Sequence, residues 1–467
     1  MNKILLAIGL GSSVVLLALS GLYLTACSRG TGGSSENCEA QVVLVVIDTL
    51  RADRLGCYGN AAGLTPNIDA LAGEGVLFSR AFSHAPWTLP SFASVLTSTY
   101  PAQHLAGGAV PNFQKLRADV KTVGECFQEA GAKTAAVVNV DFVTATFGMD
   151  RGFDQLDFVR NEGNHLTRVA RDTTDAALSW LEKMKSGPFF LMVHYFDPHL
   201  VFEPPAAFRR RFAMEQDKQG NDPVFGTRQE IMAFRRGELT LDAGTIERLE
   251  ALYNGEVAYT DEQLGRLMQG LETMGLEDAV VVVTSDHGEE FHDHGNFEHG
   301  HTLYDELIHV PLLIRWPGCI PAGLEVDSQV RHIDLAPTLL RLAGLEPPEA
   351  FEGFDLAPLW TSEGGGENRD RPVFSEGNFW GPPRFSRRAG RYKTIAHVSD
   401  RRIEIFDLEA DPQELNDLSM SDKELKRRLT DDLFLARQGM RIEAGDATSA
   451  NLTPAQLERL KALGYGY

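Results

Sequence analysis

Two continuous apolar runs constrain the fold of this chain most, because an acidic residue follows each of them. The first run, Val-Val-Leu-Val-Val-Ile at 42–47, is followed directly by Asp48, and the second, Ala-Val-Val-Val-Val-Thr at 279–284, is followed closely by Asp286. Such runs are typical of strands that are buried on both faces of a parallel sheet. Since ligands bind at the carboxyl ends of such strands, Asp48 and Asp286 are candidate functional residues.

Other strand and helix patterns alternate with these runs. Weaker strand patterns lie at 135–140, 189–194 and 311–316, and helical patterns lie at 65–72, 120–130, 169–184 and 244–274. This alternation predicts an α/β fold, with a doubly wound, mostly parallel sheet flanked by helices. Residues 206–250 are charged and poorly patterned, which indicates a surface insertion rather than a domain.

The sequence changes in character after Gly-Gly-Gly at 364–366. Short strand patterns at 372–375, 392–397 and 403–408 alternate with turn residues, and a helical pattern follows them. We therefore expect a small α+β subdomain over residues 367–467, preceded by a large catalytic domain over residues 41–366.

Residues 1–26 have the plan of a secretory signal, with Lys3 ahead of an apolar run at 4–24. The run ends in Leu-Thr-Ala-Cys, which resembles the lipobox of bacterial lipoproteins, in which the signal is removed and Cys27 becomes the lipidated first residue. A retained membrane anchor is the alternative, since about 20 apolar residues can span a bilayer. Both readings predict an exported, membrane-anchored protein on the periplasmic or cell-surface side, with 27–40 as the lipidated cysteine and a flexible tether.

The overall composition limits the class of partner. The chain has 467 residues, of which 43% are hydrophobic and 23% charged, and this excludes a disordered or multi-span protein. Its 44 Lys and Arg against 65 Asp and Glu give a net charge of -21, which opposes nucleic acid as a partner. An anionic substrate must therefore be held by a local device such as a metal ion. The cysteines show no CxxC spacing, so neither a zinc knuckle nor a disulfide framework is indicated.

His287 directly follows Asp286 and adds an imidazole to the two carboxylates. Either aspartate alone is more often a helix cap. Together, Asp48, Asp286 and His287 are ligands suited to a divalent cation.

Histidines are unusually dense after the second strand. Five of the 13 lie within 287–301, namely His287, His292, His294, His299 and His301. Some of them are expected to be bystanders in a polar loop, His292 and His294 in particular. A further pair, Asp197 and His199, follows the strand pattern at 189–194 and is expected at the same edge of the sheet.

Thr88 lies at the start of a helical pattern, two residues before Pro90. A hydroxyl at a helix start receives the positive end of the helix dipole, which favours an alkoxide or a bound oxyanion. An ordinary residue near a helix N-cap has the same pattern.

The order of these segments resembles the sulfatase family of the alkaline phosphatase superfamily, over nearly the whole chain after residue 27. The matching motifs lie at 45–59, 88–91, 152–154, 197–199, 284–288, 300–305, 310–312, 334–340 and 406–412. The resemblance places Thr88 at the nucleophile position and implies a hydrolase of sulfate or phosphate esters, of which glycan esters are one option.

The chain departs from the family pattern at several site positions. Thr88 stands where the sulfate-ester enzymes have a Cys or Ser that becomes formylglycine, so no formylglycine is expected. Phe92 replaces an arginine, Thr49 an aspartate, and His301 a lysine. What remains implies a Thr88 nucleophile at a divalent metal (Ca, Zn or Mn) that is bound by Asp48, Asp286, His287 and the Thr88 hydroxyl.

The roles of the other polar residues stay open at this point. Asp197, His199, His299 and His301 could hold a second metal or bind substrate, and His199 and His301 could instead protonate the leaving group. Alternative functions are a phosphodiesterase or phosphonate monoester hydrolase, a non-catalytic protein that binds sulfated glycans, and, least expected, a transferase.

Overall fold

The computed structural model describes residues 40–109, 112–159, 167–212, 225–361, 371–440 and 447–465. The expected signal, the lipidation site Cys27 and the tether up to residue 39 lie outside the described residues. Within these ranges, the helices are too short or too polar to cross a bilayer.

The largest sheet of the described residues has eight strands. In spatial order they are β13 (Leu324–Val326), β2 (Val76–Phe78), β12 (Leu312–Arg315), β8 (Val280–Ser285), β1 (Gln41–Ile47), β7 (Phe189–Tyr195), β5 (Lys133–Val138) and β6 (Gln155–Phe158). The five strands from β8 to β6 run parallel to one another. β12 is antiparallel to both of its neighbours, so the sheet is mixed but mostly parallel.

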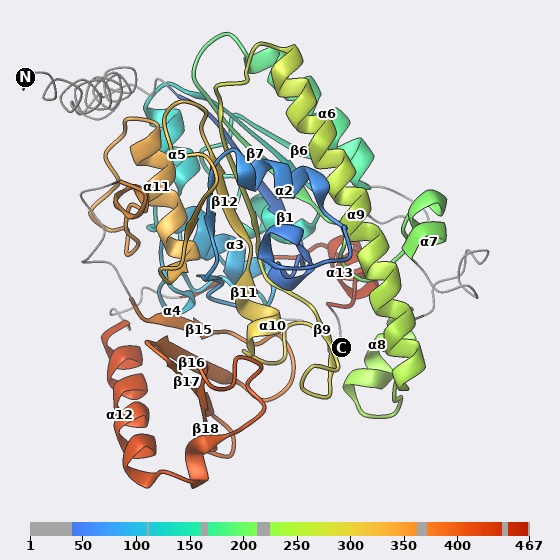
Figure 1. The fold of residues 1–467 in the computed structure, drawn as a ribbon, viewed down its shortest axis with the longest axis vertical. Coiled ribbons are helices and arrows are strands. Elements are labelled where there is room, and N and C mark those ends of the chain that lie inside the picture. The colour runs from blue at the N-terminus through green and yellow to red at the C-terminus, as the bar shows by residue number, and fades with distance from the viewer. Residues whose placement is uncertain are drawn as a thin grey trace, which may run out of the picture.

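Helices cover both faces of this sheet (Figure 1). The odd and even residues of β1 belong to different apolar clusters, as a strand with two buried faces requires. One face packs against α3 (Thr88–Thr97), α5 (Val123–Glu129) and α11 (Leu335–Leu342). The other packs against α2 (Pro66–Gly73), α6 (Ala170–Met184) and α9 (Ala243–Thr273). The expected doubly wound α/β fold is thereby confirmed.

Shorter elements complete the large domain. They are the helices α4 (Pro101–His104), α7 (Ala206–Phe212), α8 (Arg228–Arg235) and α10 (Asp305–Ile308), and the strands β3 (Ala81–Phe82), β4 (Gln114–Lys115), β9 (Glu290–Phe291), β10 (Phe297–Glu298), β11 (His309–Val310) and β14 (Val330–Arg331).

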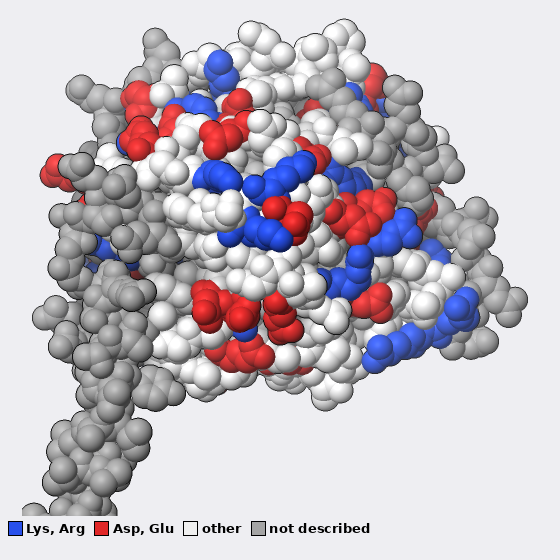
Figure 2. Space-filling view, turned by 90° about the horizontal axis from the view of Figure 1, so that it is seen from above, with Lys and Arg blue, Asp and Glu red and all other residues white. Residues whose placement is uncertain are grey.

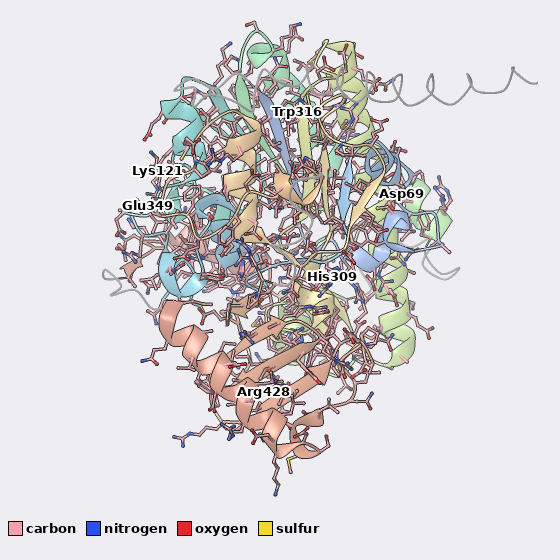
Figure 3. The ribbon with its side chains drawn as sticks, turned by 60° about the vertical axis from the view of Figure 1, so that its left-hand side comes forward. Asp69, Lys121, His309, Trp316, Glu349 and Arg428 are labelled. Carbon is pink, nitrogen blue, oxygen red and sulfur yellow. The ribbon has the colours of Figure 1, made fainter. Side chains whose placement is uncertain are left out.

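A second, antiparallel sheet forms the small α+β unit that the sequence predicts. Its strands are β15 (Val373–Glu376), β16 (Arg384–Ala389), β17 (Tyr392–His397) and β18 (Ile403–Asp407), and α12 (Lys423–Met440) packs on it. Figure 3 shows Arg428 within this unit and His309 closer to its junction with the large domain.

The next part of the chain, residues 447–465, returns to the large domain. β19 (Thr448–Ser449) pairs with β4, and α13 (Pro454–Ala462) follows it. Arg459 of α13 makes a two-pronged ion pair with Asp141, with N–O distances of 2.7 and 3.0 Å. We call residues 447–465 the α13 segment.

The charged side chains of the large domain are mixed in sign. On the face shown in Figure 2, Lys and Arg lie next to Asp and Glu. Such a face differs from the basic stripe with which proteins bind nucleic acid.

Candidate metal and nucleophile site

The carboxyl ends of β1 and β8 meet at one edge of the sheet. Ile47 pairs with Ser285 across the two strands, so the next residues, Asp48 and Asp286, extend from adjacent strand ends. His287 follows in the same turn. All three side chains are fully buried.

Helix α3 brings Thr88 to the same point. Thr88 is the first residue of this helix, after the extended Trp87, so its hydroxyl lies at the helix start as the sequence predicts. Its Oγ1 is 3.4 Å from Nε2 of His287. One turn later, Phe92 packs its ring edge-on against His194, with ring centroids 5.0 Å apart.

The side chains of Asp48, Asp286 and His287 are arranged so that a cation could bind between them. One ligand atom from each of Asp48, Asp286 and His287 can be chosen so that all lie within 4.8 Å of one another. His287 Nε2 is 3.6 Å from Asp48 Oδ1 and 3.4 Å from Asp286 Oδ2. Among the described residues, neither carboxylate oxygen has a hydrogen-bond partner. Buried carboxylate oxygens normally have a partner, and a divalent cation would supply one.

Neighbouring groups fix the orientation of the ligands. Nδ1 of His287 donates to the carbonyl oxygen of Gly288 at 2.9 Å, which leaves Nε2 unprotonated and facing the carboxylates. The backbone N–H of Asn139 donates to Nδ1 of His194, and Nε2 of His194 then donates to Asp48 Oδ2 at 3.1 Å. The sequence analysis did not find His194, because nothing in the strand pattern at 189–194 distinguishes it from a core histidine.

The electrostatics of the two carboxyl groups also favour a cation. Burial raises the pKa of Asp48 to about 7, against the opposing charge of His287. Burial and the charge of Asp48 raise the pKa of Asp286 to about 7. Two buried carboxylates with raised pKa values disfavour the charged state, and a bound cation reverses that preference.

Tyr465 of the α13 segment completes the site, and the sequence analysis missed it. Its hydroxyl lies 3.3 Å from Thr88 Oγ1, 2.9 Å from Nε2 of His199 and 3.3 Å from Nε2 of His299. Because Nδ1 of His199 donates to the carbonyl oxygen of Leu200, Nε2 of His199 accepts a hydrogen bond from the tyrosine hydroxyl. His199 and His299 therefore face the same point, beside the threonine hydroxyl.

Both of these histidines are neutral near pH 7. Burial lowers the pKa of His199 to about 3. Burial, together with the charges of His287 and His199, lowers the pKa of His299 well below its ordinary value. Each of the two rings therefore offers an uncharged nitrogen to the point beside Thr88.

Two other predicted site residues, His301 and Asp197, have different partners. His301 bonds through Nε2 to Glu290 at 2.8 Å and stacks on Trp380. The carboxylate of Asp197 acts electrostatically on the buried Glu256, whose pKa it helps to raise after the larger effect of burial. Within the described residues, the one group that could hold a metal contains neither of them. The structure thus does not bring Asp197, His199, His299 and His301 together as a second metal centre.

Arg235 of α8 reaches the site from the segment that was expected to be a surface insertion. Its guanidinium pairs with Glu298 through both carboxylate oxygens and donates to the carbonyl oxygen of Gly464 at 2.5 Å. Its side chain is 4% exposed. Part of this segment is therefore buried, because α8 packs Ile231 and Met232 into the core and carries Arg235 inward with them.

Comparisons with known proteins identify the family. Residues 40–345 match the sulfatase family, and residues 292–438 match the family described as N-sulphoglucosamine sulphohydrolase, C-terminal. The chain belongs to the sulfatase family. As a member of this family it is an ester hydrolase.

Individual relatives agree with this assignment. The N-acetylglucosamine-6-O-sulfatase of Bacteroides thetaiotaomicron is 26% identical over 87% of this chain and 87% of that protein. A structure solved in complex with its substrate D-glucosamine-2-N,6-O-disulfate superposes with a TM-score of 0.71 at 22% identity, covering 86% of this chain and 98% of that one. A phosphonate monoester hydrolase of Silicibacter pomeroyi superposes with a TM-score of 0.67 at 24% identity, covering 86% and 95%. The two structures share the fold of this chain.

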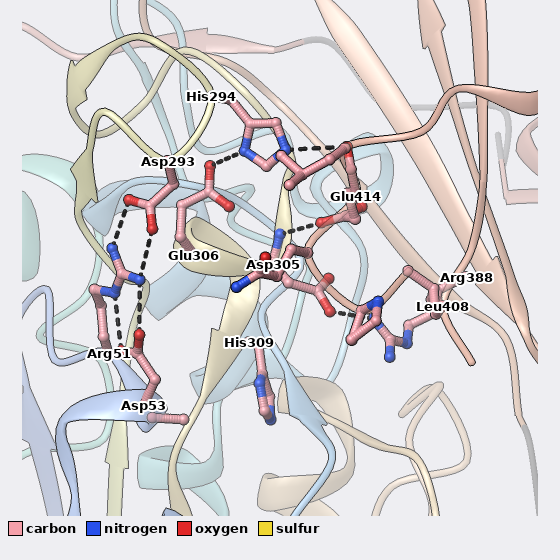
Figure 4. Close-up of a pocket in the computed structure, with 14 residues that line it drawn as sticks. Arg51, Asp53, Asp293, His294, Asp305, Glu306, His309, Arg388, Leu408 and Glu414 are labelled. Carbon is pink, nitrogen blue, oxygen red and sulfur yellow. Dashed lines mark hydrogen bonds and ion pairs between the residues drawn. The ribbon is translucent and has the colours of Figure 1, made fainter. Parts of the chain in front are cut away.

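An open pocket of this sulfatase-family chain lies away from the metal site. It has a volume of about 480 Å³ and lies where the large domain meets the loop after β18 (Figure 4). Its charged side chains pair with one another: Arg51 with Asp293, and His294 with Glu306. The pocket is therefore an ion-paired junction between the two units of the chain.

Proposed function

We propose that this chain hydrolyses sulfate or phosphate esters at a divalent metal site, with the Thr88 hydroxyl as nucleophile. The observation that carries the proposal is the position of Thr88 Oγ1. It lies at the start of α3 and 3.4 Å from His287 Nε2, which in turn lies beside Asp48 Oδ1 and Asp286 Oδ2, two oxygens without a hydrogen-bond partner among the described residues.

The residues that would hold the cation are Asp48, Asp286, His287 and Thr88. A bound divalent cation would lower the pKa of the threonine hydroxyl and neutralise charge that develops on the ester. The chain itself orients the groups: Gly288 and His194 fix the ligands, and the first turn of α3 directs its N–H groups and dipole toward the oxyanion.

The proposed reaction has two steps. Thr88 Oγ1 forms a bond to sulfur or phosphorus as the bond to the leaving alcohol oxygen breaks, and water then cleaves the Thr88 ester. His199 Nε2, which carries no proton because Nδ1 donates to the Leu200 carbonyl oxygen, accepts the proton that Thr88 releases and returns it to the leaving oxygen. His299 Nε2 binds an ester oxygen at the same point.

The relatives favour a sulfate ester as the substrate, whereas the chemistry of the site favours a phosphate or phosphonate ester. The names of relatives, including the N-acetylglucosamine-6-O-sulfatase and an ulvan-active sulfatase of Formosa agariphila, favour a sulfated glycan as substrate. A threonine nucleophile, which cannot become formylglycine, favours a phosphate ester, a phosphodiester or a phosphonate monoester, and a phosphonate monoester hydrolase is among the structural neighbours.

A substrate series tests the proposal. The purified full chain would be assayed with an aryl sulfate, a phosphate monoester, a phosphodiester and a phosphonate monoester of the same phenol, and with a 6-O-sulfated glucosamine, before and after metal removal. Turnover of at least one ester that is lost with the metal and regained on its addition is expected. Absence of both stoichiometric metal and turnover of any ester would instead favour a non-catalytic protein that binds sulfated glycans.

We also propose that the chain is an exported lipoprotein anchored at Cys27. The support is the sequence alone: an apolar run with Lys3 ahead of it and Leu-Thr-Ala-Cys behind it. A lipid anchor with a Gly- and Ser-rich tether would hold the hydrolase at the membrane surface while leaving it free to reach extended substrates.

A further inference from the structure

The side chains of the proposed catalytic centre are buried, and Tyr465 of the α13 segment packs directly against them. Thr88, Asp48, Asp286 and His287 are each 0% exposed. The Tyr465 hydroxyl stands 3.3 Å from Thr88 Oγ1 and bonds to the two histidines that would otherwise face a substrate. An ester cannot approach Thr88 while this hydroxyl is in place.

The tyrosine ring is held by an aromatic cage rather than by a chance contact. Its centroid lies 4.7 Å from that of Phe142, 5.4 Å from Phe379 and 6.5 Å from Trp87. Tyr465 itself is 1% exposed. Contacts with several aromatic rings hold the tyrosine ring in one position.

A glycine turn sends the tyrosine inward. α13 ends at Ala462, and Gly464 then adopts a φ of +90°, after which the N–H of Tyr465 donates to the carbonyl oxygen of Leu460 at 2.7 Å. Glycine adopts this conformation without the strain that a side chain brings. The turn also points the carbonyl oxygen of Gly464 at Arg235.

The guanidinium of Arg235 makes three hydrogen bonds, and the acceptor of the third belongs to the α13 segment. Glu298 satisfies two sides of the guanidinium, and the Gly464 carbonyl oxygen satisfies Nη1. If Gly464 and Tyr465 moved away, Nη1 would lose this acceptor, and a buried donor without an acceptor is unfavourable. An anionic oxygen would replace the carbonyl with a stronger, charge-assisted hydrogen bond.

We propose that Gly464 and Tyr465 form an intramolecular plug that occupies the substrate position, and that Arg235 is the anion-binding residue which the plug covers. This inference rests on the proposed function, since it takes Thr88 as the reacting group. The plug must be displaced before an ester binds. Arg235 then supplies a cationic side chain to the site. It takes the place of the arginine and the lysine of the family pattern, which are Phe92 and His301 in this chain.

Anion binding to plug variants tests the proposal independently of turnover. Calorimetric titration of the full chain with inorganic sulfate and inorganic phosphate, in the presence of Mn²⁺, would compare the wild type with Tyr465→Ala, Tyr465→Phe and Gly464→Ala. We expect Tyr465→Ala to bind the anion at least tenfold more tightly, because the cage is emptied. Gly464→Ala should act in the same direction, because it strains the turn while keeping the hydroxyl in the chain. Tyr465→Phe keeps the ring and should gain less than Tyr465→Ala.

The arginine is tested in the opened background. Adding Arg235→Gln to Tyr465→Ala should remove most of the gain in anion affinity. Tyr392→Ala, which removes a half-buried tyrosine of the small sheet, is the matched control and should leave anion affinity at the wild-type value. Circular dichroism of each variant checks that the fold is kept.

The outcomes separate this proposal from the proposed function. Wild-type anion affinity in both Tyr465→Ala and Gly464→Ala would overturn the plug, even if the wild type hydrolyses esters. If Tyr465→Ala gained anion affinity and adding Arg235→Gln did not reduce that gain, the proposed role of Arg235 in anion binding would be wrong. A gain in anion affinity in Tyr465→Ala, with no turnover of any ester by either the wild type or Tyr465→Ala, would support the plug and refute the proposed hydrolase.

Discussion

Thr88 contributes to the site through a single oxygen atom, so its substitution is the sharpest test of the chemistry. Thr88→Ala removes the nucleophile and should lower turnover by about 10³-fold or more, whereas Thr88→Ser keeps an oxygen at the start of α3 and should lose only about tenfold. Initial rates on the best ester of the substrate series measure both effects. Thr97→Ala, at the other end of α3, is the control, because its hydroxyl bonds only within the turn that ends the helix.

Asp286 is predicted to destabilise the metal-free protein and to stabilise the metal-bound one. Because folding raises its pKa from 3.8 to about 7, its cost to the fold grows as pH rises from 3.8 and is complete above pH 7. At pH 8 and without metal, Asp286→Asn should therefore unfold at a higher temperature than the wild type.

Adding a divalent cation should reverse that order. Binding at about 100 times the dissociation constant stabilises a protein by about 2.7 kcal/mol, and the variant should lose most of this gain. Thermal unfolding with a chelator and with added Zn²⁺, Mn²⁺ or Ca²⁺ measures the reversal, and Asp278→Asn, an exposed aspartate just before β8, serves as the control. Equal stabilisation of Asp286→Asn and the wild type by every cation would refute the metal site.

At the scale of elements, the loop that joins β9 and β10 couples the large domain to the small one through His294. Burial disfavours the charged ring, but the hydrogen bond to Glu306 and contact with the Glu414 carbonyl oxygen raise the pKa of His294 to about 9 (Figure 4). Since the unfolded value is 6.5, the stability that this pair contributes is fully present below pH 6.5 and is lost as pH rises through 9.

Substituting the ring should remove this dependence on pH. The wild type should lose about 1–2 kcal/mol of unfolding free energy between pH 6.5 and 9.5 relative to His294→Gln, once screening by solvent at this partly exposed pair is allowed for. Urea unfolding at four pH values measures the difference. His292→Gln, in the same loop, should follow the wild-type curve. Parallel curves for His294→Gln and the wild type would show that the ion pair contributes nothing.

The hydrophobic pattern of the sequence predicted the longer strands and helices correctly. β1 and β8 are continuous aliphatic runs, and the four helical patterns correspond to α2, α5, α6 and α9. β2 has three residues, too few to show a period. Since these strands and the start of α3 position the ligands and Thr88, this half of the candidate site could be read from the sequence.

The other half depends on contacts between distant segments. Tyr465 lies 377 positions after Thr88, and nothing in its own neighbourhood marks it as a site residue. Arg235 lies in a charged stretch, which resembles a solvated face until the packing of α8 is known. His301 follows the family motif in sequence, yet its ring turns to Glu290 and Trp380, because a motif fixes order along the chain but not the direction of a side chain.

At the scale of the whole molecule, the net charge affects both how the chain attracts its substrate and how it could be held at a membrane. A net charge of -21 repels anionic substrates at long range, so the attraction must come from groups inside the site, for which we propose a divalent cation, the start of α3 and Arg235. A protein of this charge is also repelled by anionic lipid headgroups. Surface attraction would therefore not hold it at a membrane, so the membrane location that we propose depends on the proposed lipid anchor at Cys27.

Cys27→Ser is the test of that anchor. The thioether link to lipid requires a thiol, so the variant should leave the membrane fraction of a bacterial host while keeping the turnover of the wild type, because residue 27 lies far along the chain from the first strand at Gln41. Fractionation and labelling with radioactive palmitate measure the two effects. Cys38→Ser, which keeps Cys27, should remain membrane-bound and labelled. If the wild type carried no palmitate label and mass spectrometry found residues 1–26 still attached to it, the apolar run at 4–24 would be a retained transmembrane anchor, and the lipoprotein proposal would be wrong.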